Sequence, residues 1–360
     1  MKHLHLFPNE KFTDPYISFI NTNFNPDDHF FLIIGGVSED KIKIKERKNV
    51  RKVPKNLKNI LALNMKMYSH KKILFHGLIN NKLILLLLLL QPWLLKRSNW
   101  IVWGGDLYHY LYRSRNIKSN LHEVFRRLVI RNLGTVTTLV EGDYRLAKEW
   151  YKVKGKYHHA VYINPISLEY LDKVETLEHE YKHRQRKITN IQIGNSADPS
   201  NNHVQILDLL KEFKNENINI YAPLSYSGNL AYVSKVARYG RELFGEKFIP
   251  LFDFLEPEEY SKYLGSIDIA IFNHERQQAL GNIFALLYLG KKVYLRSDIT
   301  SWDYINSQLN LDVFDISTIS GLTFSQFRAP IDKAKSKGNV VKLFSHNYIK
   351  SVWEKIFLGE

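Results

Sequence analysis

The sequence predicts an α/β protein with two successive domains, each built on a doubly wound parallel sheet. Short β-rich apolar runs alternate with amphipathic helical segments, which is typical of βαβ units. The length of 360 residues exceeds one small core, and the alternation begins again after a stretch rich in Glu and Lys. We therefore expect a first domain at 1–165, a linker at 166–187, a second domain at 188–344, and a C-terminal helix at 345–360 that packs back toward the first domain.

The overall charge of the chain calls for a negatively charged partner. The formal net charge is +15 at pH 7, which attracts nucleic acid, anionic lipid or phosphorylated ligands. Cysteine is absent, which excludes a disulfide framework, a thiol nucleophile and a cysteine-based zinc site. The N-terminal apolar run is too short for a signal peptide, so we expect a cytoplasmic protein.

The first domain begins with a predicted strand at 3–7, a helix that ends near residue 24, and a second strand at 30–34. The most basic stretch of the chain follows at 41–58, where nine Lys and Arg residues accompany one acidic residue, Glu46. Such a run is either a solvated loop or a contact with an anionic membrane surface or a pyrophosphate.

An oligo-leucine run at 83–90 is the most hydrophobic segment. It falls short of the roughly 20 apolar residues that span a bilayer, and Pro92 interrupts it. The run is therefore either a buried crossover helix or a helix that lies in the membrane surface, anchored by Trp93, Lys96 and Arg97.

Three titratable residues of the first domain end or follow predicted strands. They are Glu10, His76 and Asp106, the last of which follows the pair Gly104 and Gly105. Because the carboxyl ends of parallel strands meet at one edge of a sheet, we expect these side chains on one side of the domain. Each is a candidate base, and Asp106 is also a candidate helix N-cap or turn residue.

Two loops of the second domain have the character of a phosphate site. Gly194–Ser196 follows a predicted strand and leads toward a helix, as does the loop that contains Arg276 and ends at Gly281. The Gly194 loop is neither a Walker motif nor a dinucleotide fingerprint, because the required Lys and the partner glycines are missing. We expect the two loops to converge at one sheet edge.

Several short motifs together resemble one enzyme family. They are His5 with Glu10-Lys11-Phe12, Phe75-His76-Gly77, Trp103-Gly104-Gly105-Asp106-Leu107-Tyr108, Gly194-Asn195-Ser196-Ala197-Asp198 with Ser200, Asn201 and His203, and Arg276-Gln277-Gln278 with Gly281. In combination they look like the marks of the TDP-N-acetylfucosamine:lipid II N-acetylfucosaminyltransferases, which act in building enterobacterial common antigen. The resemblance runs over most of the chain.

This resemblance implies the GT-B glycosyltransferase architecture, in which two Rossmann-like domains face a central cleft. It implies transfer of an amino-deoxy sugar from a TDP-sugar donor to a polyprenyl-diphosphate-linked saccharide, by a cytoplasmic enzyme associated peripherally with the inner face of the plasma membrane. The donor-binding residues would be Gly194, Asn195, Ser196, His203, Tyr226, Arg276, Gln277, Gln278, Gly281 and Asn282. The acceptor-side residues would be His5, Lys11, Gly104, Gly105 and Tyr108.

Such a transfer requires neutralisation of the charge that develops on the leaving diphosphate. We expect the Gly194–Ser196 amides, Arg276 and the helix start near Gly281 to supply it, without a metal or other cofactor. Asp106 is the expected base for the acceptor hydroxyl, with Glu10 and His76 as competitors. A base is needed only if configuration inverts, and the sequence is compatible with either outcome.

Two other functions stay open on the sequence. One is a non-catalytic protein that binds nucleic acid or a membrane through its basic patch. The chain has no RNP-like aromatic motif and its basic residues do not alternate with stacking aromatics, so we expect no nucleic-acid partner. The other is a nucleotide-sugar epimerase of the same architecture, which would act on the donor alone.

Overall fold

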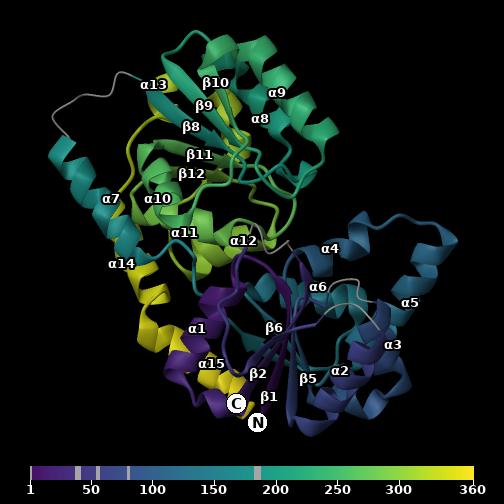
Figure 1. Cartoon of the computed structure of the whole chain (residues 1–360). Coiled ribbons are helices and arrows are strands. Elements are labelled where there is room, and N and C mark those ends of the chain that lie inside the picture. The colour runs from purple at the N-terminus through teal and green to yellow at the C-terminus, as the bar shows by residue number, and fades with distance from the viewer. Residues whose placement is uncertain (1, 37–41, 54–56, 79–81, 182–187) are drawn as a thin grey trace. The chain divides into compact units, whose positions relative to one another are not determined.

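The computed structural model describes residues 2–36, 42–53, 57–78, 82–181 and 188–360. The chain forms two compact units, one spanning Met1–Pro165 with His346–Glu360 and the other spanning Ile166–Ser345. Each unit contains one parallel sheet with helices packed against it (Figure 1). The predicted α/β class with two doubly wound sheets is therefore confirmed.

The first unit is built on a sheet of seven parallel strands. The strands are β1 (His3–Asn9), β2 (His29–Gly36), β3 (Val50–Lys52), β4 (Lys72–His76), β5 (Ser98–Ile101), β6 (Thr135–Thr138) and β7 (Lys156–His159). The helices are α1 (Thr13–Asn23), α2 (Leu57–Ser69), α3 (Lys82–Leu90), α4 (Gly105–Tyr112), α5 (Ile117–Asn132), α6 (Glu141–Tyr151) and α15 (His346–Leu358), with 3-10 turns η1 (Pro26–Asp28) and η2 (Pro92–Arg97). The strand order β3-β2-β1-β4-β5-β6-β7 reverses between β1 and β4, which is where open α/β sheets bind ligands.

The C-terminal helix α15 is part of the first unit. Its Trp353 is fully buried, and the indole Nε1 donates a hydrogen bond to the carbonyl oxygen of Val161 at 2.9 Å. The ring of Phe357 lies 4.9 Å from His3 of β1 and 4.7 Å from His29 of β2, measured between ring centroids. The amphipathic spacing of the tail is thus used to close one face of the first sheet.

The oligo-leucine run forms α3, a half-buried crossover helix. Ile84, Leu85 and Leu88 are buried, whereas Leu86 is 51% and Leu90 65% exposed. Among the described residues no helix is long and apolar enough to cross a membrane. Helix α3 therefore combines the two expected environments: one side is buried, as in a crossover helix, and the other is apolar and exposed, as in a helix that lies on a membrane surface.

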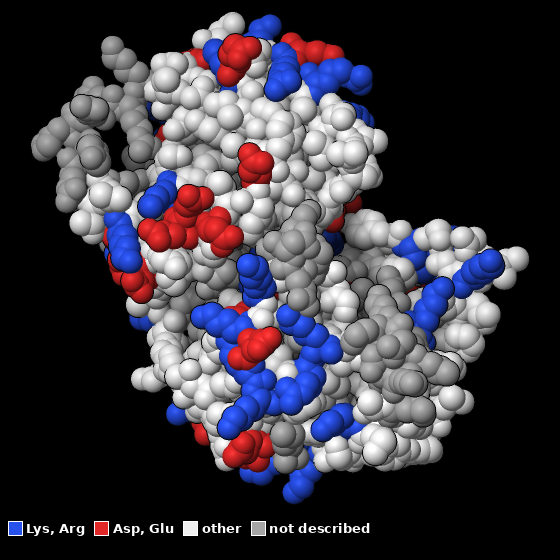
Figure 2. All heavy atoms as spheres, viewed as in Figure 1, with Lys and Arg blue, Asp and Glu red and all other residues white. Residues whose placement is uncertain are grey.

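The basic stretch at 41–58 is partly tied to the fold. Arg47 donates to Oδ1 of Asp14 and to Oγ of Ser18, each at 2.6 Å, so this guanidinium is anchored on α1. Lys41 and Lys55 lie outside the described residues. On the visible face of the first unit Lys and Arg side chains gather around a few acidic ones (Figure 2).

The second unit is built on a sheet of six parallel strands. The strands are β8 (Thr189–Ile193), β9 (Ile218–Pro223), β10 (Phe248–Leu251), β11 (Ile269–Phe272), β12 (Lys292–Leu295) and β13 (Phe314–Asp315). The helical elements are α7 (Leu168–Tyr181), η3 (Pro199–Asn201), α8 (His203–Leu210), η4 (Lys211–Phe213), α9 (Leu230–Phe244), η5 (Gly245–Lys247), α10 (Pro257–Ser266), α11 (Leu280–Tyr288), α12 (Thr300–Trp302), η6 (Asp303–Gln308), η7 (Ile316–Gly321), α13 (Phe324–Phe327) and α14 (Lys333–Leu343). The strand order β10-β9-β8-β11-β12-β13 reverses between β8 and β11.

The segment expected to link the domains, 166–187, contains helix α7 of the second unit. Glu175 of α7 lies 2.8 Å from Lys333 Nζ and also pairs with Lys337, both on α14. These two lysines lower the pKa of the Glu175 carboxyl to about 2, against the opposing effect of its own burial. Most of the expected linker is therefore a helix packed on this unit, and residues 182–187 lie outside the described residues.

Candidate active site

In the second unit the loops after β8 and β11 lie side by side, because the strand order reverses between these neighbours. Gln278 joins the two loops: its Nε2 donates to Oδ1 of Asn195 at 2.9 Å, and its Oε1 accepts from Oγ of Ser200 at 3.1 Å. Asn195 also donates to the hydroxyl of Tyr226 at 3.0 Å. The structure thus brings together three residues that the sequence analysis assigned to donor binding: Asn195, Tyr226 and Gln278.

Two arginines place positive charge at these loops. Arg276 is largely buried, and its NH2 lies 3.4 Å from Oδ2 of Asp198, a long ion pair. Arg296, directly after β12, pairs with Asp298 at 2.6 Å. The Arg296 guanidinium is thus held by a close ion pair within its own loop, whereas the longer Arg276–Asp198 pair joins the two loops. Arg296 was not foreseen from the sequence, because only the sheet order places the end of β12 next to β11.

Two fully buried histidines, His274 after β11 and His203 at the start of α8, belong to the same region. Neither ring nitrogen of His274 has a hydrogen-bond partner among the described residues, and neither does Nε2 of His203. Burial, followed by the charges of Arg276 and Arg296, lowers the pKa of His274 to about 3; burial lowers that of His203 to about 4. Both rings are therefore neutral at physiological pH. Buried polar atoms without partners are costly, so these nitrogens have hydrogen-bonding capacity left for a ligand or water. His274 carried no sequence signal except its place beside Arg276.

Gly194 holds its loop close to the second of these histidines. Its φ is +62°, and a Cβ there would lie 2.5 Å from Nε2 of His203 and 3.0 Å from Oδ1 of Asn201. A larger residue would strain the backbone and push the loop away from His203. Asn201 in turn accepts from the backbone N–H of Asn195 at 3.1 Å. The glycine is therefore required by both the turn and the close approach.

Helix α11 points its N-terminus into the same region. It begins at Leu280, one residue before the expected start at Gly281, and its N-cap Ala279 has a left-handed backbone and no side-chain cap hydrogen bond. The N-terminus of such a helix carries the positive end of the helix dipole, which favours an anion. Gln277 and Asn282 are buried on either side of this start, each 7% exposed.

In the first unit, Glu10 and Lys11 follow β1 at the edge where the strand order reverses. Glu10 is partly exposed, and burial raises the pKa of its carboxyl while the charge of Lys11 opposes the rise. A carboxylate with a raised pKa and solvent access is suited to proton transfer. Of the three candidate bases, Glu10 has the environment that this role requires.

His76 and His5 do not have such an environment. Both are fully buried, and their rings join a chain of contacts: His76 Nε2 lies 3.1 Å from His5 Nδ1, and His5 Nε2 lies 3.0 Å from His29 Nδ1. His76 Nδ1 also contacts the hydroxyl of Tyr162. Burial holds the pKa of His5 and His76 well below the usual range. The expected roles of His76 as a base and His5 as an acceptor-side residue do not fit this interior position.

Asp106 is also an interior residue, with 1% of its surface exposed. Oδ2 accepts from Nε1 of Trp100 at 2.6 Å and from the backbone N–H of Leu78 at 2.8 Å. Oδ1 accepts from the backbone N–H groups of Trp103 and Leu107, both at 2.9 Å. Burial raises its pKa to about 6, against the Trp100 hydrogen bond and other lowering effects. This carboxylate ties the ends of β4 and β5 together, so the environment favours a structural role over that of a base.

We expect Asp106→Asn to destabilise the first unit by about 2–4 kcal/mol, because an amide NH2 would face N–H donors in a buried site. Urea unfolding measures the loss, and the affinity for a nucleoside diphosphate provides the comparison. Wild-type stability together with lost turnover would contradict this assignment and restore Asp106 as a base.

The other acceptor-side candidates are dispersed. Tyr108 is 4% exposed and packs edge-on against Trp150 at 5.4 Å between centroids, so it is a core residue and does not fit the expected acceptor role. Gly104 is the buried N-cap of α4, whereas Gly105 is exposed, and a Cβ at Gly105 would meet nothing within 4 Å. Lys11 lies over the ring of Phe12 at 5.3 Å. Of the five candidates, Lys11 and Gly105 have the surface access that a substrate contact needs.

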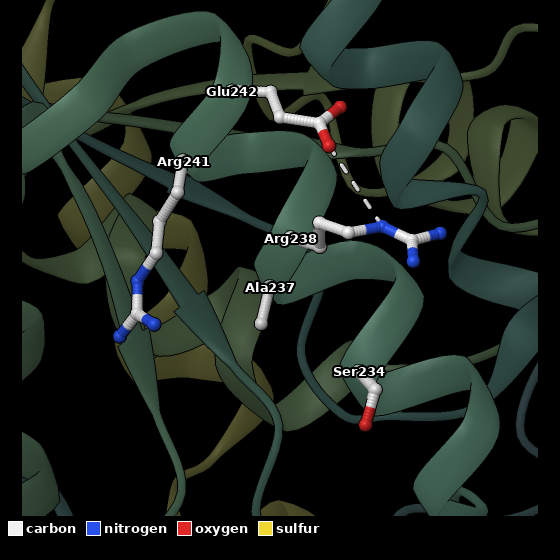
Figure 3. Close-up of a pocket in the computed structure, with 5 residues that line it drawn as sticks. All are labelled: Ser234, Ala237, Arg238, Arg241 and Glu242. Atoms are coloured by element: carbon white, nitrogen blue, oxygen red, sulfur yellow. Dashed lines mark ion pairs between the residues drawn. The ribbon is translucent and has the colours of Figure 1, made fainter.

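Two hollows on the second unit lie outside the loop cluster or at its margin. One, of about 590 Å³, is lined by residues of α9, and Arg238 and Glu242 pair across it at 3.8 Å (Figure 3). The other, of about 410 Å³, includes Gln205 and Asn273 but also the carboxylates Asp208 and Glu212, which repel an anion. The second hollow therefore lacks the chemistry of a phosphate site, and the first lies on α9, away from the Gly194 loop.

Comparison with known proteins identifies the fold and the family. A family model for 4-alpha-L-fucosyltransferases, glycosyl transferase group 56, matches residues 28–359. A solved glycosyltransferase from Rickettsia africae is similar at 14% identity and a TM-score of 0.66, covering 99% of this chain and 98% of that one. Anabaena HepE in complex with UDP and sucrose-phosphate synthase from Thermosynechococcus elongatus are each 10% identical with a TM-score of 0.68, covering 100% of both chains. The architecture is GT-B.

Proposed function

This chain belongs to glycosyl transferase group 56, the 4-alpha-L-fucosyltransferase family, and on that premise we propose that it moves an amino-deoxy sugar from a TDP-sugar donor to a polyprenyl-diphosphate-linked saccharide. The chain is a glycosyltransferase with two parallel-sheet domains. The proposed setting is bacterial surface polysaccharide synthesis at the inner face of the plasma membrane. The observation that carries the donor assignment is the convergence of Arg276, Gln278 and the α11 N-terminus on the Gly194 loop.

A nucleoside diphosphate matches the chemistry of this cluster. The positive end of the α11 helix dipole and the charge of Arg276 favour an anion. Neutral His203 and His274 have ring nitrogens with hydrogen-bonding capacity unused by the described residues. The same groups would stabilise charge on the leaving diphosphate without a metal, which is the main electrostatic requirement of the transfer. The similar structure of HepE contains UDP, which supports a nucleoside diphosphate as the ligand class.

The acceptor hydroxyl would be activated by Glu10 if the transfer inverts configuration. Glu10 is the one candidate base that combines partial exposure, a raised pKa and a position at the strand-order reversal of the first unit. His76 and Asp106 are replaced in this role because both are enclosed and engaged in interior hydrogen bonds.

Arg276→Ala is expected to weaken TDP binding about 10- to 100-fold, which is the usual effect of losing a charge-assisted hydrogen bond to phosphate. Isothermal titration with TDP measures the affinity, and a rise in unfolding temperature with TDP gives an independent measure. Arg238→Ala on α9 is the matched control, because Arg238 is highly exposed and pairs with Glu242 away from the loop cluster.

Unchanged TDP affinity in Arg276→Ala would remove this residue from the donor site. A thermal shift with nucleic acid but none with TDP would overturn the transferase proposal in favour of a binding protein. Turnover of the donor to an epimer in the absence of an acceptor would favour an epimerase instead.

A further inference from the structure

Helix α5 carries large apolar side chains on its outer face as well as its inner one. Val129 and Ile130 are fully buried against the first unit. The outer face consists of Ile117, Leu121, Val124, Phe125 and Leu128, which are between 40% and 87% exposed. Their spacing of three and four residues makes one continuous stripe. A contiguous apolar stripe on a surface helix marks an interaction site.

The charges around this stripe are almost all positive. Across 111–132, every residue of which is described, the exposed charged residues are Arg115, Lys118, Arg127 and Arg131. The one carboxylate in this segment, Glu123, is buried, and its Oε2 lies 3.3 Å from Nε of Arg126. White and blue spheres accordingly cover the region of α4 and α5 in Figure 2. The surface therefore combines apolar insertion with attraction to anions.

The neighbouring α3 and η2 extend the same chemistry. Helices α3 and α5 are in contact and lie side by side at one edge of the first unit (Figure 1). Leu86, Leu90 and Trp93 are 51%, 65% and 57% exposed, and segment 82–97 contains Lys and Arg but no acidic residue. Trp93 donates from Nε1 to the hydroxyl of Tyr68 at 3.1 Å, which keeps the polar edge of the indole satisfied. Aromatic and basic residues around an apolar centre are typical of interfacial helices.

We propose that the outer face of α5, extended by Leu86, Leu90 and Trp93, docks the first unit on an anionic membrane surface. A second copy of this chain is a poorer occupant, because a two-fold contact through α5 would bring the same arginines together. This docking proposal rests on the proposed function in one respect, which is that a lipid-linked acceptor lies at such a surface. In the basic stretch at 41–58, Arg47 is engaged by Asp14 and Ser18, whereas Lys43, Lys48 and Arg51 are exposed and would add to the attraction.

The test is sedimentation of the full chain with vesicles of equal parts phosphatidylglycerol and phosphatidylcholine, compared with phosphatidylcholine alone. Wild-type protein should sediment with the anionic vesicles and much less with the neutral ones. The double variant Leu121→Ser and Leu128→Ser should bind about tenfold more weakly or worse, since two inserting side chains are lost. The double variant Lys118→Glu and Arg131→Glu should also bind more weakly, and raised salt should reduce its remaining binding less than that of wild type.

Leu230→Ser is the matched control, because Leu230 is 85% exposed on α9 of the second unit. Unfolding temperature verifies that each variant is folded. Equal vesicle binding by wild type and the α5 apolar variant would overturn the proposal, and so would concentration-dependent dimerisation that this variant abolishes. TDP affinity of the wild-type protein separates the two proposals: TDP binding without vesicle binding contradicts the docking face alone, and vesicle binding without TDP binding contradicts the donor site alone.

Discussion

Glu10→Gln is expected to lower kcat by about 10²–10⁴-fold, the usual contribution of a general base, while TDP affinity stays at the wild-type value. We expect an effect on kcat without an effect on TDP affinity, because Glu10 follows β1 of the first unit. The residues proposed to bind the diphosphate belong to the second unit. The amide has nearly the shape of the carboxylate but accepts no proton. Initial rates of TDP release, with a TDP-sugar and a lipid-linked acceptor, measure the effect.

The pH profile gives a second measure of this assignment. A base works in its ionised form, so the rate should fall as pH falls through the pKa of Glu10. Burial raises that pKa, which places the acid limb above the ordinary value of a glutamate. Glu10→Gln should remove this acid limb from the pH profile of the remaining activity.

Asp106→Asn serves as the comparison, because its expected effect is on stability. A Glu10→Gln enzyme with wild-type kcat would show that the transfer needs no base at this position, as in a retaining reaction. Loss of TDP binding in the same variant would instead indicate a general folding defect.

Acid is expected to destabilise the first unit well above the pH at which carboxylates titrate. Four buried histidines lie on adjacent strands: His3 and His5 on β1, His29 on β2 and His76 on β4. Burial first, then neighbouring charges, lowers the pKa of His3 to about 4 and that of His29 to about 3, and burial holds those of His5 and His76 well below the usual range. The folded state therefore keeps the four rings neutral while the unfolded chain takes up protons.

The direction in which the free energy of unfolding changes with pH follows from this difference in bound protons. Because each histidine has a lower pKa in the folded state, its contribution to stability is complete above the unfolded-state pKa of about 6.5. That contribution is lost as pH falls toward the pKa of the folded state. Between pH 8 and pH 5.5 keeping His3 and His29 neutral costs about 1.4 kcal/mol each, so the two together cost about 3 kcal/mol, and His5 and His76 act in the same direction. That is a large part of the free energy of unfolding of many domains, about 5–15 kcal/mol. Chemical unfolding at the two pH values measures the loss.

His3→Phe provides the matched variant. Nδ1 of His3 has no hydrogen-bond partner within the described part of the chain, and its ring stacks on His29 at 4.9 Å, so phenylalanine keeps the packing and removes one titrating group. The acid loss should shrink by about 1.4 kcal/mol. Ile73→Val in the same core should lower stability by about 0.5–1.5 kcal/mol at both pH values without changing the difference. Identical pH dependence in His3→Phe and wild type would show that this cluster is not the acid-sensitive element.

The alternation of apolar runs and helical segments was enough to predict two parallel α/β sheets. Local chemistry controls that level, because strand and helix periods are written in consecutive residues. The same rule, that ligands gather at carboxyl strand ends, predicted that the loops at Gly194 and Arg276 converge, as Gln278 and Asn195 now show.

Only the tertiary structure decided which side chains are accessible. Glu10, His76 and Asp106 all occupy strand ends and look alike in the sequence. Packing of α15 against His76, and hydrogen bonds from Leu78 and Trp100 to Asp106, enclose these two residues and leave Glu10 partly exposed. The apolar residues of α5 likewise look alike in the sequence, because all of them follow the same helical spacing. Packing against the first unit buries some of them and leaves the others exposed. Periodicity along the chain determined the elements; burial depends on neighbours distant in sequence, so the candidate base and docking face emerged only from the fold.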